Sequence, residues 1–522
     1  MAYRVKVVAM DKDGISKTAE KNIALGDAIR ISVTPMSGPD SYPSILKVTA
    51  ESVTSNINYI ELPNGEKVEA QNGKFELKTT YNTTKNGPIV FTAYDKDGNV
   101  GMLEYDEQNV INFETEWTLD EETTITVPVT RTVDVYNDYG DGTKENVTTA
   151  NPTHTYAAGT YTMKISGKCT NFSYNESMQN YLTKLKKWGC LENYSYAFGN
   201  NNVYKGANKL TGNIPTPFEK SFQKIGNFSN LFYYCGGLTG SIPANLFANC
   251  PNVTSFSYTF DRCKNLTGSI PANLFERCSN VASYDYTFEG CSGLTGTIPE
   301  SLFKNCPKVT SFIGTFSGCT GLVGSIPERL FADNANISGL SYTFQSCKGL
   351  TNIPENLLIN CENVVDFTST FDGCKGISGI PAKLFANCTK ATKFYRTFMS
   401  CENLLNIPEN LFNNCTNVTD FSQTFYYCSN LTTIPQKLFA NCTKVTDFSC
   451  TFNSCSKLTT IPENLFDNCQ DVSNFFDTFY DCSELTGNAP ELWNRTNVSS
   501  YSGCFRRCTK LTNYADIPDD WK

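Results

Sequence analysis

Residues 428–455 read CSNLTTIPQKLFANCTKVTDFSCTFNSC. The first half, up to Cys442, has the pattern C-x-x-L-T-x-I-P-x-x-L-F-x-x-C. The second half, up to Cys455, has the related pattern C-x-x-V-T-x-F-x-x-T-F-x-x-C. Each half joins a short alternating segment, typical of a strand, to an F-x-x-C spacing of one helical turn. We therefore expect a coil of two short strands joined by two helical turns.

The same unit recurs along the C-terminal two-thirds of the chain. Its proline returns every 27 or 28 residues, from Pro215 to Pro490, and the longer units carry an extra turn glycine such as Gly268. A fixed period over about 300 residues is a specific signal for stacked repeats. At about 4.8 Å per coil, about twelve coils would form one continuous solenoid near 55–60 Å long.

Phenylalanine and cysteine recur in columns, as expected where every coil buries the same positions. Of 23 cysteines, 19 fall in two such columns, and the odd total rules out complete pairing. Buried, reduced thiols are the favoured interpretation, although like cysteines about 4.8 Å apart leave vertical disulfides possible. The ligand spacing of a zinc site is absent. The Phe column comprises Phe232, Phe260, Phe288, Phe316, Phe344, Phe371, Phe398, Phe425, Phe452, Phe479 and Phe505.

These coils resemble the BspA-like branch of the leucine-rich-repeat superfamily, over about Leu182–Lys522. The L-T-G-x-I-P phrase is also similar to the plant-type repeat, but the period and the cysteines differ. The resemblance implies surface attachment or receptor binding without catalysis, and it identifies no ligand. The first coils are degenerate, with 34 residues between Phe198 and Phe232, and residues 511–522 leave the repeat and are expected to cap it.

Residues 1–175 have the composition of small β-sandwich domains. The segment Val7–Gly14 returns 84 residues later as Phe91–Gly98, and both resemble the last hairpin of an immunoglobulin-like domain. In the segment that follows, Tyr139-Gly140-Asp141-Gly142 and the stretch from His154 resemble the paired motifs of PKD-type sandwiches.

The fold class expected is therefore mainly β, a leucine-rich-repeat solenoid C-terminal to small β-sandwich domains. The expected domains are an N-terminal strand segment at 1–25, an immunoglobulin-like domain at 26–114, a PKD-like domain at 115–175 and the solenoid at 176–522. The N-terminal segment is interpreted as the stub of a lost repeat. The alternative is a strand that completes another subunit.

Composition and motifs argue against catalysis, cofactors and metals. The single histidine, His154, is explained by the PKD-like turn, so nucleophile triads lack a base. The Asp-x-Asp-Gly turns at Asp11 and Asp95 suggest calcium, but loop position twelve holds Asn22 and Asp106 instead of Glu, so hairpin turns are expected. A net charge of -9 argues against nucleic acid.

Binding residues are expected where the repeat varies, at the two positions on either side of each Thr-Phe pair. Exposed Tyr and Arg suit recognition because aromatic rings give contact area at low entropic cost. The alternative is an ordinary solvated surface in a tyrosine-rich protein. The candidates are Tyr258, Tyr286, Tyr342, Tyr395, Arg396, Tyr426, Tyr427, Phe476 and Tyr480.

The expected partner is a bacterial cell-surface glycan or protein, with other virion proteins held through the N-terminal domains. Apolar runs are too short for a spanning helix, and the N-terminus has no signal-peptide pattern. We expect a phage tail fibre or receptor-binding protein in the virion. The alternatives are a secreted BspA-like adhesin whose export signal has been trimmed, and an intracellular scaffold.

Overall fold

The computed structural model describes residues 3–10, 16–23, 29–35, 44–52, 56–62, 66–70, 75–81, 89–96, 100–105, 113–188, 194–200, 205–217, 222, 225–248 and 250–522. The chain forms two compact units. The first comprises Met1–Tyr194, Lys209–Thr211 and Pro215–Phe222, and the second comprises the remaining residues up to Lys522. Strands and turns dominate the described residues and helices are few, so the mainly-β expectation is confirmed.

The described strands before residue 106 form three antiparallel sheets. Strands β1 (Tyr3–Met10) and β2 (Ser16–Ile23) form one pair. A second sheet has the order β3-β4-β7, from Ile29–Pro35, Ser44–Ser52 and Phe75–Tyr81. A third has the order β6-β5-β8-β9, from Lys67–Glu69, Ile57–Glu61, Ile89–Asp95 and Val100–Tyr105.

The two repeated segments of the sequence both form hairpins, β1–β2 and β8–β9. Most of their turn residues, at 11–15 and 97–99, lie outside the described residues, as does Asp106. Asp95 is described: its carboxylate is buried and accepts a hydrogen bond of 2.9 Å from Ser52 Oγ.

The next segment forms a five-stranded antiparallel sheet of order β13-β12-β15-β10-β16 and a small pair, β11-β14. Strand β10 alternates buried and half-buried side chains, as expected of a strand with one face on a core. The strands are β10 (Phe113–Leu119), β11 (Thr123–Thr126), β12 (Val129–Asp138), β13 (Lys144–Val147), β14 (Thr153–Tyr156), β15 (Gly159–Phe172) and β16 (Leu182–Lys187).

Residues 176–188, which sequence analysis assigned to the repeats, lie with this sheet in the first unit. Helix α1 (Glu176–Tyr181) begins at Asn175, whose side chain accepts a 3.0 Å hydrogen bond from the Met178 amide. Strand β16 then pairs antiparallel with β10 as the edge of the sheet.

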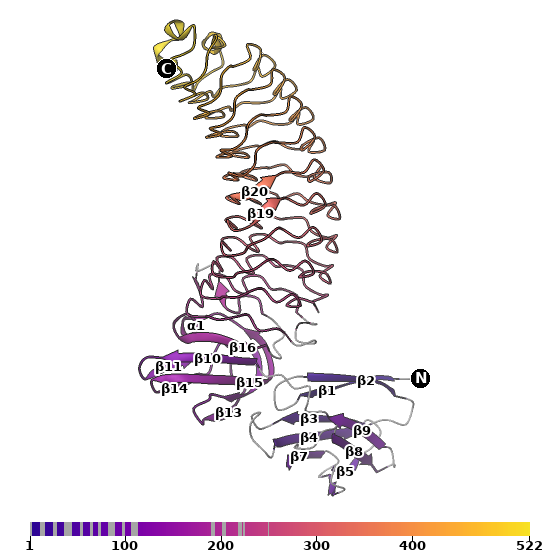
Figure 1. Ribbon diagram of the computed structural model, residues 1–522. Coiled ribbons are helices and arrows are strands. Elements are labelled where there is room, and N and C mark those ends of the chain that lie inside the picture. Colours follow the sequence, from indigo (N-terminus) through magenta and orange to yellow (C-terminus); the bar gives the residue numbers. More distant parts are fainter. Residues whose placement is uncertain are drawn as a thin grey trace. The chain divides into compact units, whose positions relative to one another are not determined.

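From residue 225 onward the second unit is a stack of coils that follow one another in sequence order (Figure 1). Single-residue parallel bridges join each coil to the next, and their series runs without a break from Ser255 through Asp366 and Asp420 to Ser500. The expected strands are therefore reduced to single bridges over most of the stack. Among the described coils, only β19 (Val323–Ser325) and β20 (Gly349–Asn352) extend into a short parallel pair.

Left-handed residues explain why the strands are so short. In the coil of Phe260, Tyr258 and Arg262 have φ of 59°, and the same two positions are left-handed in coil after coil. The N–H groups of residues 256, 258, 260 and 262 donate to the next coil, whereas those of 259, 261 and 263 close turns within their own coil. This alternation gives every one of these amides a partner without an extended strand.

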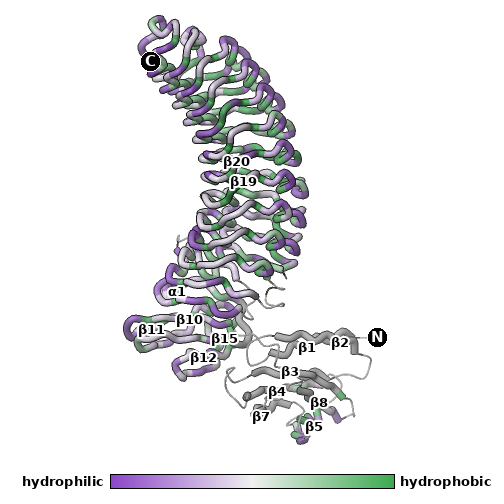
Figure 2. Tube along the Cα trace, viewed as in Figure 1, coloured by the Kyte–Doolittle hydropathy of each residue, from purple (hydrophilic) through white to green (hydrophobic). Residues whose placement is uncertain are grey.

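Aromatic columns fill the interior. Rings of the Phe column lie 5.4–5.9 Å apart from Phe198 to Phe505, nearly parallel throughout. Two further columns pack beside it, and rings such as Phe247 and Phe256 meet at a tilt of 54° with centroids 4.6 Å apart. Figure 2 shows hydrophobic residues at matching places in successive coils. Offset and tilted ring contacts of this kind add to the free energy of burial.

Polar ladders connect the coils beside these columns. Thr259 Oγ1 lies 2.6 Å from the carbonyl oxygen of Phe256 and 3.2 Å from that of Phe228, and later coils repeat the arrangement. Asn280 Nδ2 donates to the Pro251 carbonyl of the preceding coil at 2.7 Å. The repeated Thr and Asn of the sequence are therefore inter-coil connectors.

The column cysteines are buried free thiols. Cys263 Sγ lies 3.2 Å from the carbonyl oxygen of Phe232 in the preceding coil, and Cys374 Sγ lies 3.0 Å from that of Phe344. A small side chain with a weak donor fits this position, which explains the column. Their burial is confirmed, and their reduced state in solution stays a prediction.

Both ends of the stack depart from the repeat, as expected. In the longer interval between Phe198 and Phe232, strand β17 (Gly199–Asn200) pairs antiparallel with β18 (Lys205–Gly206), while the two Phe rings still stack at 5.4 Å. At the other end three short 3-10 helices occupy Leu492–Asn494, Tyr514–Asp516 and Asp519–Trp521. None of the helices in the described part of the chain has the length and apolar character that crossing a membrane requires.

Candidate functional site

The nine candidate residues lie in one segment of the coil, which we call the ladder face. It comprises residues 257–262 and their equivalents in later coils, including 395–400 and 476–481. The third and fourth positions are the buried Thr and Phe of the core columns, and the other four vary. Inter-coil hydrogen bonds fix the backbone of the whole segment, so the variable side chains stand on a rigid base.

Exposure of the candidates is smaller than the sequence suggested. Tyr427 and Phe476 are exposed, at 47% and 43%, whereas the other seven are half-buried. The reason is the close stacking of coils, because neighbouring side chains at a spacing near 5 Å cover one another.

Tyr258, Tyr286 and Tyr342 occupy one column, as predicted, but only the first two form a ring contact that the structure records. Their rings stack with centroids 4.9 Å apart and planes 13° apart. The next coil has Gly314 in this column, and the Tyr286 ring lies in the space that a side chain there would need. Burial, then the neighbouring Tyr258, raises the pKa of Tyr286 to about 12.

A second cluster joins Tyr395, Arg396 and Gln423 across two coils. The Arg396 guanidinium lies over the Tyr395 ring at 4.9 Å, and its Nε donates to Gln423 Oε1 at 2.7 Å. Tyr426 and Tyr427 form a neighbouring ring pair with centroids 6.2 Å apart. The structure therefore groups four candidates on adjacent coils, with the arginine held in place.

A third cluster lies near the C-terminal end, around Tyr480. Arg506 and Arg507 of the next coil lie 5.9 Å and 5.4 Å from its ring centroid. Neither arginine was among the candidates. The repeat pattern could have identified both arginines, because they occupy the two variable positions that follow the Phe of the column, here Phe505.

Five candidates hold left-handed backbone conformations that no sequence signal indicated. They are Tyr258, Tyr286, Tyr342, Arg396 and Tyr427, with φ between 55° and 62°. Outside glycine this conformation costs about 1–2 kcal/mol per residue. Inter-coil hydrogen bonds such as that from the Tyr258 amide to the Asp285 carbonyl, at 2.8 Å, hold these residues in place.

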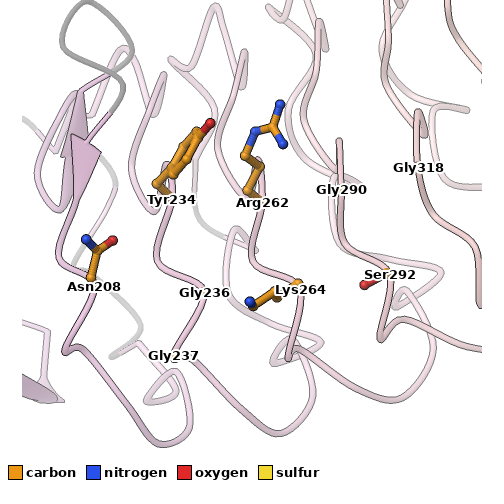
Figure 3. A pocket seen from close by; sticks show the side chains of 9 residues that line it. All are labelled: Asn208, Tyr234, Gly236, Gly237, Arg262, Lys264, Gly290, Ser292 and Gly318. Atoms are coloured by element: carbon orange, nitrogen blue, oxygen red, sulfur yellow. The ribbon is translucent and has the colours of Figure 1, made fainter.

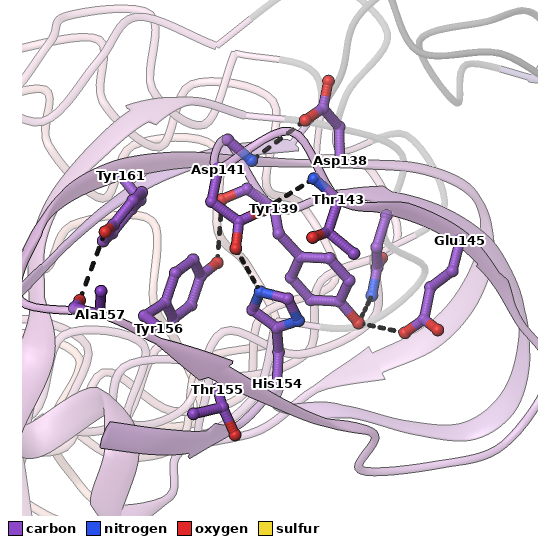
Figure 4. Close-up of polar contacts among 12 residues, drawn as sticks. Asp138, Tyr139, Asp141, Thr143, Glu145, His154, Thr155, Tyr156, Ala157 and Tyr161 are labelled. Atoms are coloured by element: carbon purple, nitrogen blue, oxygen red, sulfur yellow. Dashed lines mark hydrogen bonds and ion pairs between the residues drawn. The ribbon is translucent and has the colours of Figure 1, made fainter. Parts of the chain in front are cut away.

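The single histidine lies in the first unit and packs against a turn, as expected (Figure 4). Its ring stacks on Tyr139 with centroids 3.8 Å apart, and its Nε2 lies 2.7 Å from Asp141 Oδ2. Tyr156 OH donates to the Tyr139 carbonyl at 2.9 Å. Burial alone would raise the pKa of Asp141, but hydrogen bonds from His154 and the Thr143 amide hold that pKa below its usual value. These contacts give His154 a structural role.

Reactive groups in the second unit are mostly buried. Burial raises the pKa of Cys263 well above its usual value and that of Cys361 to about 12, so these thiols stay protonated at neutral pH. Cys450 is half-buried, and burial raises its pKa to about 11. Among the described residues no three His, Cys, Asp or Glu side chains converge as a metal site would require.

Three overlapping segments of the chain match one family model, described as "Mycoplasma protein of unknown function, DUF285". They are residues 195–329, 310–438 and 392–518, which together span more than half of the chain. The chain belongs to this family. The DUF285 segments coincide with the stacked coils and contain all nine candidates, in agreement with the BspA-like repeat resemblance.

No curated protein matches the chain. A solved structure titled "Crystal structure of TLR13-ssRNA13 complex" matches 63% of this chain at 12% identity, with a TM-score of 0.16. The match covers 65% of that structure's chain, which is less than two thirds of its length. At this TM-score the match carries no conclusion for the DUF285 protein.

Proposed function

We propose that this protein is a non-enzymatic recognition protein that contacts a bacterial surface through the ladder face of a leucine-rich-repeat solenoid. The observation that supports this proposal is the cluster of Tyr395, Arg396, Tyr426 and Tyr427 at variable positions on a rigid base. Aromatic and arginine side chains are the ones that most often contribute strongly to binding. Because Gln423 already holds Arg396, little side-chain entropy is lost on contact.

The leucine-rich-repeat assignment rests on the stacked coils of 27 or 28 residues and their parallel bridges. In repeat proteins each coil contacts only its neighbours, so a varied surface can be carried by an unchanging core. The ladder face fits that arrangement, with Thr and Phe buried and four positions free to differ.

We assign the immunoglobulin-like and PKD-like domains to a spacer role. The antiparallel sheets before residue 113 and the sheet built around β12 and β15 are consistent with such domains. In the second of these, the rings of Tyr139, His154, Tyr156 and Tyr161 form a cluster whose centre, Tyr139 and Tyr156, is buried, so these aromatic residues serve the fold. Attachment to other virion proteins through these domains is part of the proposal.

For the biological setting we propose a phage tail fibre or receptor-binding protein. The buried free thiols favour it, because a protein assembled in a reducing cytosol keeps cysteines unpaired. A secreted BspA-like adhesin is the alternative, and the family match favours it, since the family description names a bacterium. The neighbouring genes decide: tail genes support the first, and an export signal upstream supports the second.

The experiment uses the labelled full chain and a panel of intact bacterial cells. Changing Tyr395, Arg396, Tyr426 and Tyr427 together to Ala is expected to abolish cell binding. The matched control changes Ile359, Val365, Leu405 and Lys390 to Ala. These residues are three exposed apolar side chains and one exposed cation away from the ladder face.

Both variants should keep the parental melting temperature, so that loss of binding reports on the surface. Binding that survives the ladder-face change, or that the control abolishes equally, contradicts the assignment to this face. Failure of the parent chain to bind any cell in the panel contradicts surface recognition of those bacteria.

A further inference from the structure

An open groove of about 680 Å³ crosses the first coils of the second unit, away from the second cluster described above (Figure 3). Successive coils supply its walls, with Asn208, Tyr234, Arg262 and Lys264 among the lining residues. None of these four is among the nine candidates. The volume lies in the range of ordinary ligand sites, and the open form suits a segment of a longer chain.

The floor of this groove is formed by glycines, which have no side chain to fill it. Gly290 and Gly318 occupy the same left-handed position as Tyr234 and Arg262, with φ of 65° and 71°. A Cβ at Gly290 would lie 3.3 Å from Arg262 Cγ, and one at Gly318 would lie 3.4 Å from the Gly290 Cα. A ligand can therefore approach the backbone of two consecutive coils directly.

The side chains that line the groove carry positive charge and no negative charge. Lys264 is exposed, and Arg262 lies over the Tyr234 ring at 5.1 Å with half of its side chain exposed. Ser292 and Asn208 add uncharged polar groups. The charge of this lining suits an anionic ligand.

The acidic side chains nearest to Arg262 neutralise its positive charge only weakly. Asp261 Oδ1 lies 3.8 Å from Arg262 Nε, too far for a hydrogen bond, and has no hydrogen-bond partner. Burial, then the charge of Glu289, raises the pKa of Asp261 to about 8. Burial also raises the pKa of Glu289. Because Asp261 makes no hydrogen bond to Arg262 and half of the Arg262 side chain is exposed, Arg262 keeps charge available for a ligand.

We propose that the groove binds a segment of an acidic polysaccharide, with Arg262 and Lys264 on its carboxylates and its sugar rings over the backbone of Gly290 and Gly318. An acidic peptide is the less favoured occupant, because sites for acidic peptide motifs use clusters of arginines and Arg262 is the one arginine among the residues that line the groove. The inference deepens the proposed recognition function by naming a ligand class for a second region of the stack.

The test is calorimetric titration of the full chain with a uronic-acid tetramer, and with the same tetramer after its carboxyl groups are reduced to alcohols. Only the acidic form should bind, and its affinity should fall with added salt. Changing both Arg262→Gln and Lys264→Gln should weaken it roughly tenfold or more. The control pair, Arg277→Gln and Lys308→Gln, removes the same charge from exposed residues outside the groove and should leave the affinity unchanged.

Equal binding of the neutral tetramer, absence of binding, or an equal loss in the control pair would overturn the proposal. Tighter binding of a short polyglutamate than of the tetramer would replace the glycan by a peptide. The quadruple alanine variant of the ladder face should bind the tetramer normally. A failure of the groove to bind the tetramer and a failure of the ladder face to bind cells are thereby measured separately.

Discussion

The indole ring of Trp521 lies flat on the ring of Tyr501, with centroids 4.8 Å apart and planes 8° apart. The Trp521 carbonyl also accepts a hydrogen bond from the Phe505 amide at 2.9 Å, as the next coil would do elsewhere in the stack. Arg495 completes the end by donating to the carbonyl oxygens of Cys469 and Phe466 at 2.7 and 2.6 Å. The last coil thus ends on side chains that replace a missing neighbour.

Removing this cap should loosen the last coils. We expect Trp521→Ala to lower the free energy of unfolding by about 3 kcal/mol, because a buried indole is lost. Hydrogen exchange should accelerate first in residues 475–522. Trp493→Ala, at a half-buried position nearby, should have a smaller effect, and equal effects would mean that Trp521 has no special capping role.

A central change should destabilise more coils than a terminal one. Phe371 stacks between Phe344 and Phe398 at 5.6 and 5.5 Å, so Phe371→Ala should lower the free energy of unfolding by about 3–5 kcal/mol. Urea denaturation measures this loss of free energy. The control is Phe476→Ala, which removes an exposed side chain and should have a smaller effect. A loss below about 1 kcal/mol would contradict the assignment of the Phe column to the core.

The column thiols should be unreactive in the folded protein. Because burial raises the pKa of Cys361 and Cys415 to about 12, few thiolates exist at pH 8, and a disulfide reagent should modify half-buried Cys450 before the column cysteines. In denaturant without reductant most of the 23 cysteines should titrate. If fewer than half do, the columns contain disulfides.

Asp261 should make stability depend on pH. Burial raises its pKa to about 8 in the folded protein, from 3.8 in the unfolded chain. The contribution of this side chain to the free energy of unfolding is therefore fully present below pH 3.8 and is lost as the pH rises to about 8. Asp261→Asn should therefore be more stable than the parent at pH 8, by about 1–3 kcal/mol, with the difference shrinking toward pH 4. Exposed Asp471→Asn is the control, and the same pH profile in both variants would refute this origin.

Much of the stack was predictable from sequence because a buried position repeats wherever coils contact identical neighbours. The period identified the Phe and Cys columns, and the loss of the pattern after residue 511 identified the cap. The helical turns and strands were not predictable in detail. Tyr258 and Arg262 adopt a left-handed conformation usually signalled by glycine or asparagine, and inter-coil hydrogen bonds override that preference.

The candidate surface was predictable in position and not in its contacts. Variation on either side of the Thr-Phe pair located the ladder face. The packing of the Tyr286 ring over Gly314 could not be predicted, because it depends on which residues of successive coils lie next to each other in space. The groove was missed because its floor consists of Gly290 and Gly318, which a search for large side chains passes over. Segment 176–188 was assigned to the repeats because it shares the Leu-Thr phrase, whereas its strand pairs with β10.

The alternation of amide donors along residues 256–263 has a consequence for how such a molecule changes length. Each coil donates these amides to the carbonyl groups of the next coil and accepts the equivalent amides of the preceding coil, so a duplicated or deleted coil leaves no mismatched edge behind. Recombination between the repeats of such a gene can therefore lengthen or shorten the molecule in whole coils. Each such event would also change which surface residues lie on adjacent coils. The length of the stack and its binding specificity would therefore change together.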